Sequence, residues 1–134
     1  MNNKGFLFDN AHFLLRFVIA SVFLFHGVGK LVDVGGFAQM MGMHIGVAWL
    51  VTLAEVLGGL GIIVGAFLRN DLVTRLAGAA IVPVMAGAIA LVHWPRWSFT
   101  PSESHPMGGM EFQVSLLLIG LYFAIVGNAK AATQ

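Results

Sequence analysis

Four long apolar segments, separated by short stretches richer in glycine and polar residues, dominate the pattern of this sequence. They cover about residues 12–32, 46–68, 72–94 and 111–127. Each approaches the roughly 20 residues that an α-helix needs to cross about 30 Å of hydrocarbon. A lone strand cannot satisfy its backbone hydrogen bonds in lipid, so all four segments are expected to be helices. The pattern predicts an all-α integral membrane four-helix bundle that forms a single domain over residues 1–134.

The composition agrees with a membrane protein and excludes several classes of function. Hydrophobic residues make up 58% of the chain and charged residues 10%, whereas a soluble domain has about 25% charged residues. A net charge of +1 without a basic run argues against nucleic-acid binding. The chain contains no cysteine, which excludes disulfides, thiolate metal sites and any thiol relay run by this chain.

Lysine and arginine are unequally divided between the two sides of such a bundle. One side would carry Lys4, Arg16, Arg69, Arg75 and Lys130, and the other would carry Lys30 and Arg96. Cytoplasmic segments of membrane proteins carry the excess of positive residues. We therefore expect both termini and the turn at residues 69–71 to be cytoplasmic, with Arg16 and Arg75 touching lipid phosphates. Segments 33–45 and 95–110 would lie outside, the first with a short interfacial helix at residues 35–41.

Ionisable side chains within the apolar segments fall on restricted helix faces, which predicts that they face the interior of the bundle. At about 100° per residue, His26 and Lys30 share one face of the first segment. Glu55 lies beside a stripe of glycine and alanine in the second segment, while His93 ends the third and Glu111 begins the fourth. Under the expected topology all five lie in the outer half of the bundle. They are therefore predicted to surround one site, with Lys30 or His26 as the partner of Glu55.

These residue types suit proton-coupled chemistry on an oxygen-bearing ligand. The candidate catalytic residues are Glu55, His26 and Lys30. The candidate cofactor-binding residues are His26, Lys30, His93 and Glu111. A quinone headgroup fits this set, with His26 or Lys30 donating to a carbonyl oxygen and Glu55 or Glu111 handling protons. Electrons would have to come from a partner, because the sequence contains no cofactor motif.

Other interpretations of the same residues stay open. His26 and His93 could bind haem axially, and His26, Glu55 and His93 could together hold a metal, although no metal ligands are assigned. Glu55 could be purely structural, paired with Lys30 or a histidine. Lys30 could extend its ammonium to the membrane surface. His93 and Trp94 could form an interfacial anchor.

Several short motifs occur in a fixed order along essentially the whole chain. They are Leu14-Leu15-Arg16, Phe25-His26-Gly27-Val28-Gly29-Lys30-Leu31, Gly36-Phe37, Ala48-Trp49-Leu50, Ala54-Glu55-Val56-Leu57-Gly58-Gly59, then Gly65, Arg69, His93 and Gly109-Met110-Glu111-Phe112. In this order they resemble the DoxX family. The resemblance implies a small four-helix protein of the bacterial inner membrane, similar to the small subunit of thiosulfate:quinone oxidoreductases. Other relatives are linked to quinone detoxification or to membrane oxidoreductase complexes, and the resemblance assigns no role to any single residue.

Two hypotheses from different functional classes follow. The first is a quinone-linked membrane oxidoreductase subunit with a polar site in the outer half of the bundle. The alternative is a non-enzymatic membrane anchor or assembly subunit of a larger complex. A small-solute carrier is disfavoured, because four short helices leave little room for alternating access. The expected partners are the lipid bilayer and either another protein or further copies of this chain.

The topology can be tested by labelling, since the chain has no cysteine of its own. Single cysteines at Ser102 and Asn70 should react differently with a membrane-impermeant thiol reagent. In intact cells we expect labelling at Ser102 alone, because Asn70 lies in the turn assigned to the cytoplasm. Labelling at Asn70 alone would invert the orientation.

Overall fold

The structure is a computed structural model that describes residues 10–128, and the described residues form helices and no strand. Lys4 and Lys130, which entered the orientation argument, lie outside the described residues. The elements are α2 (His12–Val32), α3 (Val34–Met41), α4 (Ile45–Gly65), α5 (Leu72–Ala88), the π-helical turn η1 (Ile89–His93) and α6 (Glu111–Val126). The all-α class is confirmed for this part of the chain.

Three helical segments in the described range are long and apolar enough to cross a membrane: α2, α4 and the continuous stretch Leu72–His93. The fourth apolar helix, α6, has 16 residues and is shorter. Helix α4 ends at Gly65, whereas the predicted boundary at residue 68 lies in the turn that leads to α5. The third predicted segment finishes in a π-turn instead of a regular α-helix.

The short helix expected at residues 35–41 is present as α3, and the sequence explains both of its ends. The Asp33 carboxylate accepts a hydrogen bond from Gly36 N at 2.8 Å, which satisfies a free N–H group of the first turn. Gly42 follows the last turn with a φ of 60°, a left-handed conformation that glycine adopts without strain. Asp33 and Gly42 thus fix where α3 begins and ends.

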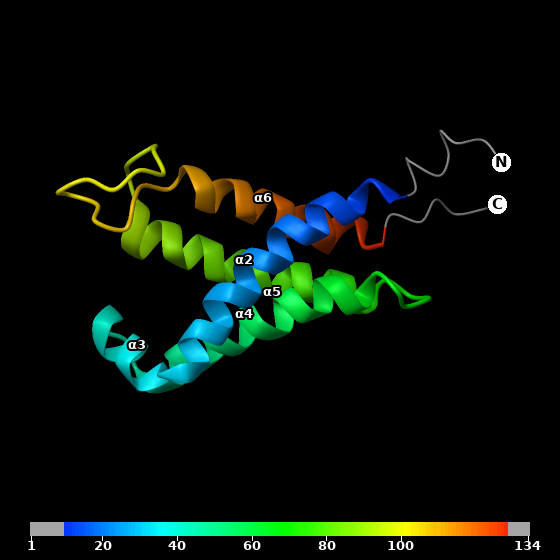
Figure 1. Cartoon of the computed structure of the whole chain (residues 1–134), viewed down its shortest axis with the longest axis horizontal. Coiled ribbons are helices and arrows are strands. Elements are labelled where there is room, and N and C mark those ends of the chain that lie inside the picture. Colours follow the sequence, from blue (N-terminus) through cyan, green and yellow to red (C-terminus); the bar gives the residue numbers. More distant parts are fainter. Residues whose placement is uncertain (1–9, 129–134) are drawn as a thin grey trace.

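The helices pack in sequence order: α2 on α4, α4 on α5, and α5 on α6. The remaining pair of neighbours, α2 and α6, makes far fewer contacts. Figure 1 shows α3 and the loop between η1 and α6 at one end of the molecule, and the α4–α5 turn at the other. We call the first the loop end and the second the Arg16 end, after the residue described below. Because α2 and α6 touch so little, the bundle is open between them toward the loop end.

Glycines let the helix backbones approach closely at the packed interfaces, as small residues do in membrane bundles. A Cβ on Gly27 of α2 would lie 2.9 Å from Val56 N of α4. A Cβ on Gly78 of α5 would lie 2.6 Å from Ala124 N and Gly120 O of α6. These glycines therefore mark the contact lines between helices.

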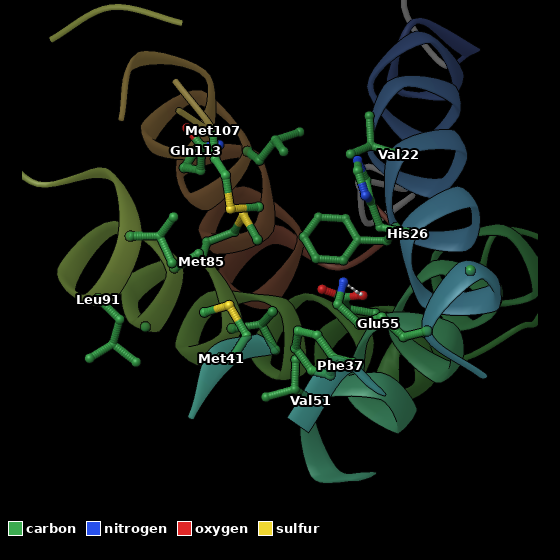
Figure 2. Close-up of a pocket in the computed structure, with 18 of the residues that line it drawn as sticks. Val22, His26, Phe37, Met41, Val51, Glu55, Met85, Leu91, Met107 and Gln113 are labelled. Atoms are coloured by element: carbon green, nitrogen blue, oxygen red, sulfur yellow. Dashed lines mark hydrogen bonds and ion pairs between the residues drawn. The ribbon is translucent and has the colours of Figure 1, made fainter. Parts of the chain in front are cut away.

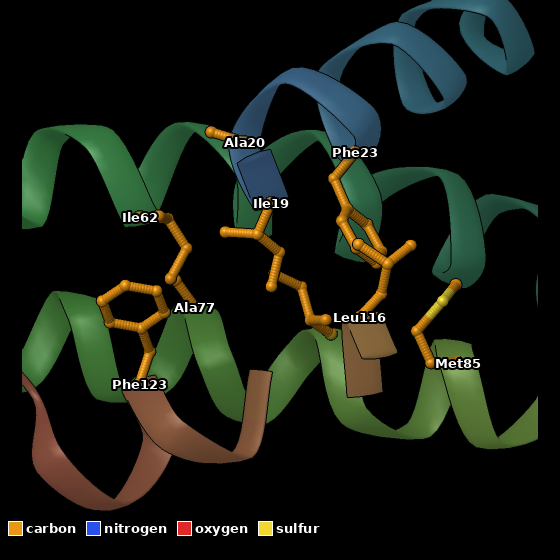
Figure 3. Close-up of a cluster of buried hydrophobic side chains, with 9 residues drawn as sticks. Ile19, Ala20, Phe23, Ile62, Ala77, Met85, Leu116 and Phe123 are labelled. Carbon is orange, nitrogen blue, oxygen red and sulfur yellow. The ribbon is translucent and has the colours of Figure 1, made fainter. Parts of the chain in front are cut away.

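The apolar core draws on all four long helices (Figure 3). Its buried members are Ile19, Ala20, Phe23, Ile62, Ala77, Ile81, Met85, Leu116 and Phe123. The outside of the bundle is also apolar. Large hydrophobic side chains such as Leu14, Phe17, Leu57, Phe67, Leu76 and Ile125 are exposed. A soluble monomer rarely exposes so much contiguous apolar surface, so this exterior is that of a multi-pass membrane protein.

Arg16 corrects one expectation from the sequence. Instead of touching lipid phosphates, its side chain is 2% exposed and points into the bundle. Its guanidinium donates to the Ile62 carbonyl oxygen, to Thr74 Oγ1 at 3.2 Å and to Asn128 Oδ1 at 3.0 Å. It also lies 4.8 Å from the centroid of the Phe123 ring. Hydrogen bonds inside the bundle compensate the cost of burying the guanidinium. The same bonds tie α2 to the three other long helices or their ends.

Arg75 likewise finds partners within the chain. Its Nε donates at 2.7 Å to Oδ2 of Asp71, the residue just before α5. Its Nη1 donates to the carbonyl oxygens of Ala124 and Ile125 in the last turn of α6. These carbonyls have no partner within their own helix, and a cation is favourable at this end of the helix dipole. Arg75 thus caps α6.

The close approach of α5 and α6 gives a stability prediction with a matched control in the same helix. Gly78→Ala should lower the free energy of unfolding by about 1–3 kcal/mol, because the new Cβ would meet backbone atoms that cannot move aside. Gly87→Ala should be neutral or slightly stabilising, since nothing lies within 4 Å of its Cβ position. Thermal unfolding in detergent measures both. Equal effects of the two substitutions would show that α5 and α6 are not in this close contact.

Candidate functional site

A pocket of about 1180 Å³ lies toward the loop end, with α2, α3 and α4 on one side and α5, η1 and α6 on the other. Figure 2 shows His26 and Glu55 facing it from one side, with Met85 and Gln113 across from them. Most of the lining is apolar, including Phe23, Phe37, Val51, Met41, Met85, Leu91, Met107 and Leu116. Ligand pockets are typically about 300–1,000 Å³, apolar, and supplied with a few polar groups. The pocket therefore has the size and character of a site for a mainly apolar organic molecule.

An ion pair contributes two charged groups to the wall of this pocket. Lys30 Nζ donates to Glu55 Oε2 at 2.7 Å, and the two side chains are 19% and 5% exposed. The ammonium also lies 5.1 Å from the centroid of the Phe37 ring, a cation–π distance. A partner for Glu55, either Lys30 or His26, was expected from the sequence, and Lys30 is that partner. Both side chains line the pocket.

The local sequence explains why these two groups meet. Gly27 precedes Lys30 by three residues on α2, and its missing side chain lets α2 lie against α4 beside Glu55 and Val56. Positions three apart share one helix face, so Lys30 extends from the same face that packs on α4. The His-Gly-x-Gly-Lys and Ala-Glu-x-x-Gly-Gly motifs are therefore the two halves of one helix contact.

His26 lines the pocket from α2 but remains exposed at its edge. Its ring packs edge-to-face against Phe25, with centroids 5.4 Å apart. Between residues 10 and 128, no hydrogen bond or ion pair joins His26 to Glu55. His26 is thus a polar group at the rim of the pocket, while Lys30 holds Glu55.

His93 lines the same pocket from the end of η1 and is 6% exposed. Its Nδ1 is 2.8 Å from the carbonyl oxygen of Gly108, in the loop that leads to α6. His93 lies in a π-turn, which contains more residues than an α-turn, so α-helical spacing does not give the direction of its side chain. In place of an interfacial anchor, the structure gives His93 a buried position that ties the loop to the pocket wall.

Glu111 is the one candidate that the structure does not place in the pocket. It is half-buried in the first turn of α6, where a negative charge suits the helix dipole. The next two residues, Phe112 and Gln113, line the pocket instead. Two residues correspond to about 200° around a helix, so Glu111 and Gln113 point in nearly opposite directions. Of the five residues expected in one site, the pocket lining thus includes His26, Lys30, Glu55 and His93, and not Glu111.

Gln113 was missed because the sequence analysis followed ionisable residues only. It lies three residues before Leu116 and seven before Gly120, both buried in the packed face of α6. A glutamine on the inward face of an apolar helix is a signal that periodicity alone could have revealed. Its Oε1 is buried without a hydrogen-bond partner in the described part of the chain.

Within residues 10–128, no three histidine, aspartate or glutamate side chains come together as metal ligands. Glu55 is bonded to Lys30 and His93 Nδ1 to a backbone carbonyl. The metal site considered from the sequence, with His26, Glu55 and His93 as ligands, is therefore not formed by these residues.

Comparisons with known proteins agree with the resemblance drawn from the motifs. The sequence model of the family described as DoxX matches residues 11–94, which include His26, Lys30, Glu55 and His93. A protein of Bacillus subtilis (strain 168) named "Putative oxidoreductase CatD" is 28% identical over 130 residues, covering 94% of this chain and 84% of that protein. No solved structure matches the chain at a significant level.

The Lys30–Glu55 pair predicts that a variant with both residues replaced is more stable than a variant with Lys30 alone replaced. Lys30→Met should lower the free energy of unfolding by about 3 kcal/mol, because a carboxylate is left buried without its cation. Lys30→Met combined with Glu55→Leu should recover most of that loss, since it replaces the pair with apolar groups. The measurement is denaturant or thermal unfolding in detergent.

The exposed Asp71–Arg75 pair, whose side chains are both 42% exposed, is the control. Asp71→Asn should lower the free energy of unfolding by less than about 1 kcal/mol. If the double variant at Lys30 and Glu55 is as unstable as the single one, or more so, the two side chains are not coupled as described.

Proposed function

This chain belongs to the DoxX family, and from that premise we propose that it is a quinone-linked subunit of a membrane oxidoreductase. One observation carries the proposal: a buried ion pair, Lys30–Glu55, lies in the wall of a large and otherwise apolar pocket. The Bacillus subtilis relative, which is 28% identical, carries the name "Putative oxidoreductase CatD" and supports the same class.

The proposed arrangement in the membrane is a four-helix bundle with both termini cytoplasmic, in the bacterial inner membrane. In it, α6 is the fourth span, although its 16 residues cover only about 24 Å. Arg16, Arg69 and Arg75 belong to the Arg16 end, and Lys30 and Arg96 to the loop end. The positive-inside rule then puts the Arg16 end in the cytoplasm. The pocket would open in the outer half of the membrane.

The pocket suits a quinone in both shape and access. A quinone headgroup is a flat ring with two carbonyl oxygens, which needs apolar walls and one or two hydrogen-bond donors. Phe25 and Leu91 line the pocket and are 77% and 76% exposed. Exposed apolar side chains at the rim would face lipid in the proposed arrangement. A membrane-dissolved quinone could therefore enter sideways without crossing water.

The chemistry proposed for the site divides between this chain and a partner. Reduction of one quinone to its quinol takes two electrons and two protons. An ammonium has three N–H donors, of which Glu55 uses one in the described structure. Lys30 can therefore donate to a quinone oxygen and stabilise the negative charge that develops there. Glu55, hydrogen-bonded to Lys30, would take up and deliver protons, while His26 would be a second donor at the rim. The electrons would come from a partner redox protein.

A second candidate function is supported by the same ion pair. Lys30 and Glu55 are paired with each other without any ligand, so their role could be only to hold α2 on α4. In that case the chain would be a non-enzymatic anchor or assembly subunit. The two functions differ in whether the pocket binds a small molecule.

Quinone binding tests the proposal directly. The protein is purified in mild detergent, scanned for absorbance, and its extract analysed by mass spectrometry for quinones and partner proteins. It is then placed in nanodiscs and titrated with a short-chain benzoquinone, followed by the fluorescence of its three tryptophans. We expect quinone in the extract and saturable binding.

Lys30→Met should weaken quinone binding about tenfold or more, the effect of losing one hydrogen bond from a charged donor. Asp71→Asn is the control and should bind as the natural protein does. Absence of quinone binding, together with a stoichiometric partner protein, would overturn the proposal in favour of the anchor. A haem absorbance band would show that the bound cofactor is haem and would contradict the proposal of a quinone.

A further inference from the structure

We propose that Gly29 and Gly87 determine how large a ligand the pocket accepts, because the ligand occupies the space beside their backbones. The ligand class that we infer is a quinone wider than a single ring, such as a bicyclic naphthoquinone. The inference rests on the proposed function and adds to it the size of the quinone. It concerns binding and no transfer of electrons.

Gly29 and Gly87 differ from the other glycines within the helices of the described residues. The others have a neighbour close to the position of a Cβ atom, as in the 2.8 Å that would separate a Cβ on Gly61 from Ala77 Cβ. At Gly29 in α2 and Gly87 in α5, nothing lies within 4 Å of that position. Glycine within a helix destabilises it relative to alanine. Helix packing therefore gives no reason for glycine at these two positions.

Gly29 borders the pocket from α2. Phe25 and His26, the residues four and three positions before it, line the pocket as well. At about 100° per residue, these two side chains project about 40° and 60° to either side of the direction of a Cβ on Gly29. The open space beside Gly29 thus lies between two side chains that border the pocket. The next residue along the chain is Lys30, whose ammonium is bonded to Glu55.

Gly87 has the same relation to the pocket on α5. Pro83 and Val84, again four and three positions earlier, line the pocket on either side of it. Leu91 follows Gly87 by four residues, and Figure 2 shows Leu91 and His26 on opposite sides of the pocket. The two glycines therefore leave open space on both sides of the pocket, one on α2 and the other on α5.

The volume of the pocket also favours a large ligand. Its 1180 Å³ exceeds the roughly 1,000 Å³ at the upper end of typical ligand pockets. A single quinone ring would leave much of this space empty and lose the contacts that a filled pocket provides. A wider flat ring gains those contacts, and glycine allows it to lie directly against the helix backbone.

The test compares the dissociation constants of a naphthoquinone and a benzoquinone, both without a side chain, for the whole protein in nanodiscs. Each constant is expressed relative to the quinone dissolved in the lipid, because the two compounds partition differently. We expect the natural protein to bind the naphthoquinone at least as tightly as the benzoquinone. Gly29→Leu and Gly87→Leu should each weaken naphthoquinone binding about tenfold or more, as overpacking does. Benzoquinone binding should stay within about threefold.

Matched controls separate this effect from damage to the fold. Ser21→Leu in α2 and Ala86→Leu in α5 add a side chain of the same kind at exposed positions outside the pocket lining, and should change neither constant. Thermal unfolding in detergent checks that each variant is folded. Gly29→Ala and Gly87→Ala fill less space and should weaken naphthoquinone binding about threefold. They decide the test if a leucine variant does not fold.

The outcomes distinguish this inference from the proposed function. If the folded variants at Gly29 and Gly87 bind both quinones as the natural protein does, or weaken both by the same factor, these positions do not select by size and only the inference fails. The same holds if the natural protein binds the benzoquinone and not the naphthoquinone. If neither quinone binds the natural protein, the proposed quinone function itself fails.

Discussion

Glu55 is buried between helices, and its need for a cationic partner determines how α2 meets α4. An unpaired carboxylate in an apolar surrounding costs far more free energy than one that is paired and hydrogen-bonded. Lys30 meets this need from α2, and Gly27 permits the close approach of the two helices that the 2.7 Å contact requires. The walls of the pocket follow from this contact, because it holds α2 on α4 and leaves α2 and α6 nearly out of contact.

The two ends of the bundle solve the problem of a buried cation differently. At the Arg16 end, the guanidinium is surrounded by neutral oxygens from Ile62, Thr74 and Asn128, and it joins the helices. At the loop end, Lys30 is paired with a carboxylate and borders a pocket. The buried charge of Arg16 thus joins the helices at one end, whereas the charge of Lys30 borders a pocket at the other. This asymmetry is the physical basis on which we propose a structural role for Arg16 and ligand binding for Lys30.

The helices could be predicted from the sequence, because segment length and apolar pattern determine them. A partner for Glu55 on the first helix could also be predicted, but spacing left His26 and Lys30 open, and the structure shows that it is Lys30. The sequence predicted that Arg16 touches lipid phosphates, and this was wrong. Its main partners are a backbone carbonyl and an asparagine far along the chain, and no helical periodicity reveals such partners. Glu111 was assigned to the site because it lies on a polar helix face at the expected depth, but a two-residue offset turns it away from the face of Gln113, which lines the pocket. The pattern of charged residues therefore could not predict the roles of uncharged polar side chains or the partners that side chains find far along the chain.

Photolabelling with a short-chain azidoquinone tests the central claim most directly, that the pocket beside Lys30 and Glu55 binds quinone. The label is activated in nanodiscs, and the modified residues are located by peptide mass spectrometry. The account predicts modification of pocket residues such as Met85 and Met107, which excess unlabelled quinone suppresses. Modification confined to lipid-facing residues such as Phe17 and Leu57, unaffected by competition, would contradict it.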